Sequence, residues 1–152
     1  TMLRYFRQVR EALKPDGIFF LDAYGGYDSY RVIVEERVIQ GDAGPFTYIW
    51  DQDQYDPVSG RLLCYIHFAF GDGSRLERAF TYDWRLWSLP EIRELLAEAG
   101  FGRVICYWQG WDDEGQPDGR FVPVEEGEPE AGWIAYLTAE RSTLTGARGK
   151  PD

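Results

Sequence analysis

Apolar and polar residues alternate through the middle of the chain, in the period-two pattern of half-buried β-strands. Three such runs span residues 46–55, 61–70 and 75–84, and the turn sequences DPVSG and GDGS separate them. The preceding run, YRVIVEERVIQ at residues 30–40, fits neither the helical nor the strand period; we assign it to a strand, with a helix as the alternative. The pattern therefore predicts an antiparallel meander of three or four strands.

Alternation also predicts which residues face one another, because a one-residue slip in register would turn every side chain to the opposite face. Loops at residues 56–60 and 72–74 predict that Tyr48 faces Phe68, Trp50 faces Ile66, Ile66 faces Phe80, Cys64 faces Tyr82, Leu62 faces Trp84 and Phe70 faces Leu76. One face then carries an aromatic wall, which we expect to be core: Phe46, Tyr48, Trp50, Ile66, Phe68, Phe70, Phe80, Tyr82 and Trp84. Its tip residues Tyr48, Trp50 and Tyr82 could instead flank a substrate. The other face is mostly polar.

The elements on either side of the meander predict an α/β fold. A helix is expected over residues 2–14, followed by a strand at 17–21 whose even apolarity is typical of a strand covered on both faces. A second helix begins at the capping-box sequence SLPE, residues 88–91, and ends at Gly100. Strands at 103–108 and 133–139, an acidic loop at about 110–130 and a disordered tail at 142–152 complete the prediction.

Composition narrows the classes of function. The 152 residues carry a formal net charge of -10, which argues against a nucleic-acid partner, because phosphate binding requires a basic surface. Neither a membrane span nor a signal peptide is evident, so we expect a cytoplasmic protein with no membrane partner. Cys64 and Cys106 are expected to be buried thiols, and no residue spacing predicts a metal site.

Two motifs and their order resemble the C-terminal half of a class I S-adenosylmethionine-dependent methyltransferase. The sequence LKPDG, residues 13–17, stands where that family has an LKPGG turn before its fifth strand. The sequence ELLAEAGF, residues 94–101, stands where the family has an ELLxxAGF helix before its sixth strand. The resemblance covers nearly all of residues 1–140 and implies that the last strand returns antiparallel between the other two.

The resemblance implies a partial class I, Rossmann-like sheet over residues 1–141, with antiparallel strands inserted at about 30–85. The family binds its cofactor through a glycine-rich loop and an acidic residue on earlier strands, which would precede this sequence. We therefore expect the parent protein to use S-adenosylmethionine, and this chain by itself to be inactive, with no cofactor-binding residues and no tight cofactor binding. Gly25 and Gly26 lack the spacing of the family's loop.

The expected role is recognition of a small-molecule acceptor. Residues at the end of the strand at 17–21 and on the meander are the substrate-binding candidates: Asp22, Tyr24, Gly25, Tyr27, Trp50, Tyr82 and Arg85. Asp22 could instead cap a turn, and Arg85 could instead pair with a nearby acid. His67, the one histidine, is a candidate general base; the alternative is a solvated residue on the polar face.

A different class of function also fits the sequence. The chain could be a non-catalytic module that binds a small ligand or self-associates, because an open apolar strand edge at residues 18–21 would invite pairing with another chain.

Overall fold

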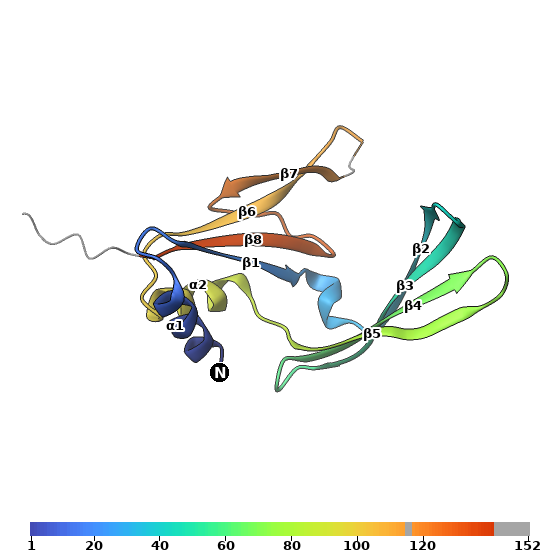
Figure 1. The fold of residues 1–152 in the computed structure, drawn as a ribbon, viewed down its shortest axis with the longest axis horizontal. Helices are drawn as coiled ribbons and strands as arrows, with labels where there is room; N and C mark the ends of the chain where they lie inside the picture. Colours follow the sequence, from blue (N-terminus) through green and yellow to red (C-terminus); the bar gives the residue numbers. More distant parts are fainter. Residues whose placement is uncertain (115–116, 142–152) are drawn as a thin grey trace, which may run out of the picture. The chain divides into compact units, whose positions relative to one another are not determined.

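The structure is a computed structural model that describes residues 1–114 and 117–141. The described chain forms two compact units (Figure 1). The first unit contains residues 1–23, 88–128 and 134–141; the second contains Tyr24–Trp87 and Pro129–Trp133. The predicted tail at 142–152 lies outside the described residues. Within the described ranges, no helix combines the length and apolarity needed to cross a membrane.

A four-stranded sheet in the order β1-β8-β6-β7 organises the first unit. Its elements are α1 (Met2–Ala12), β1 (Ile18–Gly25), α2 (Leu89–Glu98), β6 (Val104–Trp111), β7 (Pro117–Val124) and β8 (Trp133–Glu140). Strand β6 pairs antiparallel with both β7 and β8. The predicted helices and the strands near residues 18, 104 and 133 are confirmed.

Contacts at the two ends of β1 define its direction relative to β8. The backbone N–H of Arg141 donates to Gly17 O at 3.0 Å, whereas at the other end of β1 Gly25 lies against the Trp133 side chain. Residue numbers thus rise along one strand as they fall along the other, so β1 and β8 are antiparallel. The last strand therefore returns between β1 and β6, as expected, and neighbouring strands of this sheet are antiparallel throughout.

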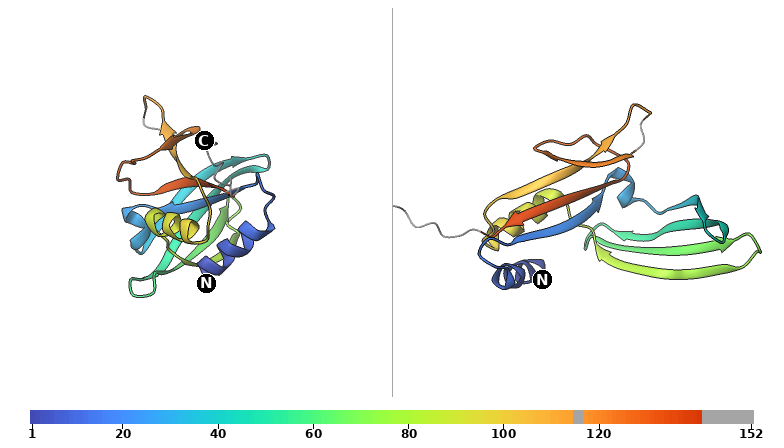
Figure 2. Two further views of the ribbon diagram at one scale, coloured as in Figure 1. Left: turned by 90° about the vertical axis from the view of Figure 1, so that its left-hand side faces the viewer. Right: turned by 45° about the horizontal axis from the view of Figure 1, so that its top comes forward.

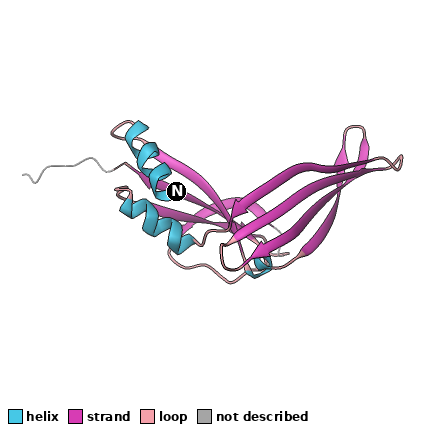
Figure 3. Ribbon diagram, turned by 90° about the horizontal axis from the view of Figure 1, so that it is seen from below, coloured by secondary structure: helices cyan, strands magenta, loops and turns pink. Residues whose placement is uncertain are grey.

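Both helices cover one face of this sheet (Figure 3). Helix α2 begins at the predicted capping box, in which the Ser88 side chain accepts from Glu91 N–H and the Glu91 carboxylate accepts from Ser88 N–H. The ring of Phe19 on β1 packs against Phe6 of α1 at 5.9 Å and against Phe101 after α2 at 6.0 Å. The core of the first unit lies on this face.

The opposite face of β1 is open, which corrects the prediction of a strand covered on both sides (Figure 2). Ile18 and Phe20 are each 58% exposed, whereas Ala23 on the helix-covered face is buried. Ile134 of β8 is also exposed. A strand that is apolar at every position has side chains suited to burial on both faces. The sequence does not show whether the described chain covers both of those faces.

The predicted acidic loop at residues 110–130 contains a strand, so that prediction was wrong. Strand β7 pairs with β6, placing Val122 opposite Trp108 and Val124 opposite Cys106. The segment FVPV is short and contains a proline, so its own pattern is weak; pairing with the edge of β6 supplies the backbone hydrogen bonds that make it a strand.

The second unit contains the meander, which has four strands in sequential order. They are β2 (Ile33–Gly41), β3 (Gly44–Asp56), β4 (Arg61–Phe70) and β5 (Arg75–Arg85), preceded by a 3₁₀ turn, η1 (Tyr27–Tyr30). The assignment of residues 30–40 to a strand is confirmed for 33–40. Every predicted pair is present except one: Tyr48 with Phe68, Trp50 with Ile66, Ile66 with Phe80, Cys64 with Tyr82 and Leu62 with Trp84.

The exception is Phe70, which does not face Leu76. A bulge in β5 shifts the register beyond Ile66, so Leu76 faces Phe68 instead. Arg78 lies in this bulge with φ 49°, a left-handed conformation that is uncommon for a residue with a side chain. Simple alternation could not predict the bulge.

The aromatic wall exists but is only partly core. Trp50 contacts Tyr82 and Trp84, with ring centroids 6.0 Å and 6.4 Å apart. Ile66 is the buried member of the wall, whereas Phe70, Phe80 and Trp84 are exposed. The prediction that these three residues are core was therefore wrong, because a sheet face buries only the residues that neighbouring groups cover.

Candidate functional site

The side chain of Gln52 on β3 is the centre of a buried polar network in the second unit. Gln52 is 0% exposed, and its Nε2 donates to Asp28 O at 2.9 Å and to Arg31 O at 2.8 Å. Its Oε1 accepts from Tyr24 Oη at 2.6 Å and from Trp50 Nε1 at 3.2 Å. One buried amide thus ties two predicted substrate-binding residues, Tyr24 and Trp50, to the turn that follows β1.

Burial strengthens the preference of the Tyr24 phenol for its protonated form. Desolvation, together with nearby Cys64, Glu35 and Asp28, raises the pKa of Tyr24 to about 12. At neutral pH the phenol is therefore a hydrogen-bond donor to Gln52. Tyr24 also packs edge-on against Trp50, with ring centroids 6.2 Å apart, so the two rings support each other.

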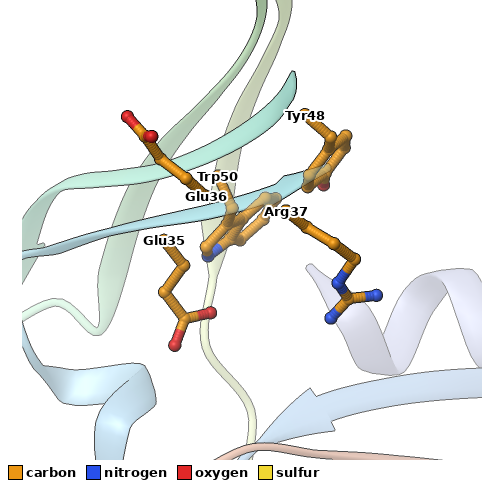
Figure 4. Close-up of a pocket in the computed structure, with 5 residues that line it drawn as sticks. All are labelled: Glu35, Glu36, Arg37, Tyr48 and Trp50. Carbon is orange, nitrogen blue, oxygen red and sulfur yellow. The ribbon is translucent and has the colours of Figure 1, made fainter. Parts of the chain in front are cut away.

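A hollow of about 390 Å³ lies beside these rings, and we call it the Trp50 hollow. Its lining residues are Glu35, Glu36, Arg37, Tyr48 and Trp50 (Figure 4). Register explains the arrangement: on β2, Glu35 pairs with Trp50 and Arg37 pairs with Tyr48, so these four side chains share one face. Figure 4 shows the side chains of Glu35 and Arg37 on one side of β2 and that of Glu36 on the other.

The hollow combines aromatic rings with charges of both signs. Burial raises the pKa of Tyr48, nearby Tyr82 raises it further, and the positive charge of Arg37 offsets part of this increase. Glu35 and Arg37 form no ion pair or side-chain hydrogen bond with any described residue. An aromatic surface flanked by a free carboxylate and a free guanidinium can bind an organic molecule that carries complementary charges.

The structure brings Tyr24, Trp50 and Tyr82 together through the ring contacts of Trp50. Asp22 is exposed within β1, which continues to Gly25, so the expectation that Asp22 stands at the strand exit was wrong. Tyr27 begins η1 and is exposed. The guanidinium of Arg85 lies 3.8 Å from the ring centroid of Trp87, a cation–π contact.

The two glycines after Tyr24 are close to the chain's own residues. A Cβ at Gly25 would lie 2.3 Å from the Trp133 ring, and one at Gly26 would lie 2.3 Å from Ala131 O. Gly26 has φ 113°, a conformation that favours glycine. These glycines allow close packing of residues 131–133, and the space beside them is already filled.

His67 is buried between two acids, which corrects the solvated alternative. It is 8% exposed; its Nδ1 lies 2.5 Å from Glu77 Oε2, and its Nε2 lies 3.3 Å from Asp51 Oδ2. The backbone N of Arg78, in the β5 bulge, lies 3.1 Å from the same ring nitrogen. A histidine held on three sides by its own sheet has a structural role here.

Among the described residues, no group of three or more His, Cys, Asp and Glu side chains is placed to hold a metal ion. Cys64 and Cys106 are free and buried, as predicted, and burial raises the pKa of Cys64 to about 12, which disfavours a reactive thiolate.

Sequence reasoning missed Glu35, Arg37 and Gln52. The ambiguous period of residues 30–40 left the faces of β2 unassigned, so nothing indicated that Glu35 lies opposite Trp50. Gln52 lies two positions from Trp50, on the same face of the strand. A polar residue at this inward position was the feature of the sequence that could have indicated a buried hydrogen-bonded side chain.

Comparison with known proteins bears on the fold. The structure is similar to that of the CcbJ methyltransferase from Streptomyces caelestis, with a TM-score of 0.52 and 15% sequence identity. The match covers 89% of this chain and 51% of that protein, so the chain spans about half the length of this neighbour. No protein-family model matches the chain. No curated protein matches it either. The chain therefore has a methyltransferase-like fold.

Proposed function

We propose that the chain is the acceptor-recognition part of a class I, S-adenosylmethionine-dependent methyltransferase that acts on a small molecule. The observation that carries this proposal is the structural match, which covers most of this chain but only 51% of the neighbouring methyltransferase. The order of β1, β8 and β6, with β8 antiparallel between the others, also supports it. In this proposal the strands contributed here belong to a larger, Rossmann-like sheet.

The Trp50 hollow is the best candidate for the acceptor site in this chain. Methyl transfer depends on holding the nucleophile in line with the methyl group, so most of the protein's contribution is positioning. The aromatic rings of Tyr48 and Trp50 offer a surface for the acceptor, and Gln52 restrains Trp50 and Tyr24. His67 is held by Asp51, Glu77 and Arg78, so we do not assign it as a base.

The described residues around Gly25 and Gly26 do not fit S-adenosylmethionine. The Gly25–Gly26 pair is the nearest approach to a cofactor loop, but Trp133 and Ala131 occupy the space that a ligand would need. In this proposal the cofactor, which supplies the methyl group in the parent protein, binds to a part of that protein outside this chain. No catalytic step is therefore assigned to the residues described here.

Calorimetric titration with S-adenosylhomocysteine tests the proposal. The 152-residue chain is expected to bind it weakly or not at all, whereas a longer product of the same gene that extends upstream of Thr1 is expected to bind it tightly. Tight binding to the chain alone, or weak binding to both proteins, would contradict the proposal.

A second candidate function is self-association, favoured by the exposed apolar face of the first unit. Ile18, Phe20 and Ile134 are exposed on that face, and β1 is an edge strand of its sheet. Sedimentation at rising concentration would show a dimer or larger assembly, and Phe20→Ser is expected to shift it toward monomer. Replacement of Val58, which is exposed in the turn between β3 and β4, is the control.

A further inference from the structure

The Trp50 hollow has a charge arrangement that points to a class of ligand. Glu35 and Arg37 are two positions apart on one face of β2, with Trp50 and Tyr48 directly across from them on β3. Figure 4 shows the carboxylate and the guanidinium on the same side of the strand, flanking the Trp50 ring. Neighbouring opposite charges on a sheet often pair, yet these two do not pair with each other or with any other described side chain.

The Glu35 carboxylate and the Arg37 guanidinium have different neighbours, and each set of neighbours suits a different charged group of a ligand. The Glu35 carboxylate is near enough to the ring of Tyr24 to contribute to raising its pKa, and Tyr24 packs on Trp50. Aromatic faces together with a carboxylate are the groups that recognise an organic ammonium ion. Arg37 lies by Tyr48, and a guanidinium beside an aromatic ring recognises a carboxylate or another planar anion.

The rings themselves are held in place. The Trp50 indole N–H donates to the buried Gln52 amide, and Trp50 also contacts Tyr82 and Trp84. Because these contacts restrict the indole, its exposed face is preorganised, and a ligand binding there would lose less free energy in ordering the site.

We propose that the Trp50 hollow binds a small zwitterion, with its ammonium group between Glu35 and the Trp50 face and its anionic group at Arg37. This inference deepens the proposed function and rests on it in one respect. If the hollow is the acceptor site, the methyl acceptor is an amine that also carries an acidic group. The binding itself requires no cofactor.

The experiment uses 4-(aminomethyl)benzoate as the probe, with benzylamine and benzoate as ring-matched probes that each lack one charge. Binding to the 152-residue chain is followed by the NMR shift of the Trp50 indole N–H, assigned among the six tryptophans with Trp50→Phe. The zwitterion is expected to bind about threefold to fivefold more tightly than either single-charge probe, the gain expected of one exposed ion pair.

Variants assign the gain to particular residues. Glu35→Gln is expected to reduce the affinity for 4-(aminomethyl)benzoate to that for benzoate, and Arg37→Gln to reduce it to that for benzylamine. Asp42→Asn is the matched control, because it removes a carboxylate of the same charge from the exposed turn between β2 and β3, which does not line the hollow. It is expected to leave the affinity unchanged.

Three results would overturn the inference: no shift of the Trp50 signal with any probe up to about 20 mM, equal affinities for the three probes, or equal losses for Glu35→Gln and Asp42→Asn. The measurement is made without cofactor. Failure of the titration with S-adenosylhomocysteine in the longer protein would therefore reject the methyltransferase proposal and leave the binding result standing, and the converse also holds.

Discussion

The phenol of Tyr24 donates a hydrogen bond of 2.6 Å to the side-chain oxygen of Gln52, 28 positions further along the chain. The bond joins the end of β1 to the centre of the meander within the second unit. Because Gln52 is fully buried and bonded at both its oxygen and its nitrogen, this contact is expected to have measurable consequences.

Replacement of Gln52 is expected to destabilise the second unit. In Gln52→Met the side chain keeps a similar length but leaves Tyr24 Oη, Trp50 Nε1 and two backbone carbonyls without their partner, so unfolding should require about 2–4 kcal/mol less. Urea denaturation followed by tryptophan fluorescence measures the change. Gln54→Met, at an exposed position of the same strand, is the control. Equal losses in the two variants would contradict a special role for Gln52.

The Tyr24 phenol predicts a loss of stability at high pH. Its pKa is raised to about 12 in the folded protein, against about 10 for an unfolded chain, so the folded state favours the protonated form. The stabilisation is therefore fully present below pH 10 and declines as the pH rises from 10 through 12. Denaturation across this range is expected to show a shallower decline in Tyr24→Phe than in the unmodified chain.

The exposed Tyr27 provides the comparison for that measurement. Tyr27→Phe is expected to leave the pH dependence unchanged, and an identical dependence in Tyr24→Phe would show that another group is responsible.

The contacts of His67 predict which ring nitrogen carries a proton. Its Nδ1 lies 2.5 Å from Glu77 Oε2, and an ionised carboxylate oxygen can only accept, so Nδ1 must carry a proton. Long-range ¹H–¹⁵N spectra should show a protonated Nδ1, without ambiguity of assignment because the chain has one histidine. A ring protonated at Nε2 alone would contradict the arrangement.

Gly25 predicts the effect of adding a single methyl group. In Gly25→Ala the new Cβ would lie 2.3 Å from the Trp133 ring, so the ring or the strand must move, at about 1–3 kcal/mol of stability. Thermal denaturation measures the change, with Gly71→Ala as the control, because a Cβ there would meet nothing within 4 Å. An undisturbed Gly25→Ala would mean that the space beside Gly25 is open to a ligand.

The sequence by itself determined the helices, three strands of the meander (β3, β4 and β5) and most of the register between them. Period-two alternation was sufficient to place Trp50 opposite Ile66 and Tyr48 opposite Phe68, because a slip would have turned the apolar side chains of both strands to the wrong face. The capping box at Ser88 and Glu91 is likewise a local device that is readable from residue types alone.

Only the tertiary structure decided the features that depend on contacts between distant segments. The strand β7 exists because β6 offers it an edge, and the bulge at Arg78 moves Leu76 away from Phe70 and closes around His67. The same is true of the candidate site: Glu35 becomes part of it through pairing with Trp50, and Gln52 through bonds to Tyr24 and to the turn that follows β1. Local periodicity reports which faces suit burial, whereas burial and polar pairing depend on what the rest of the chain places against them.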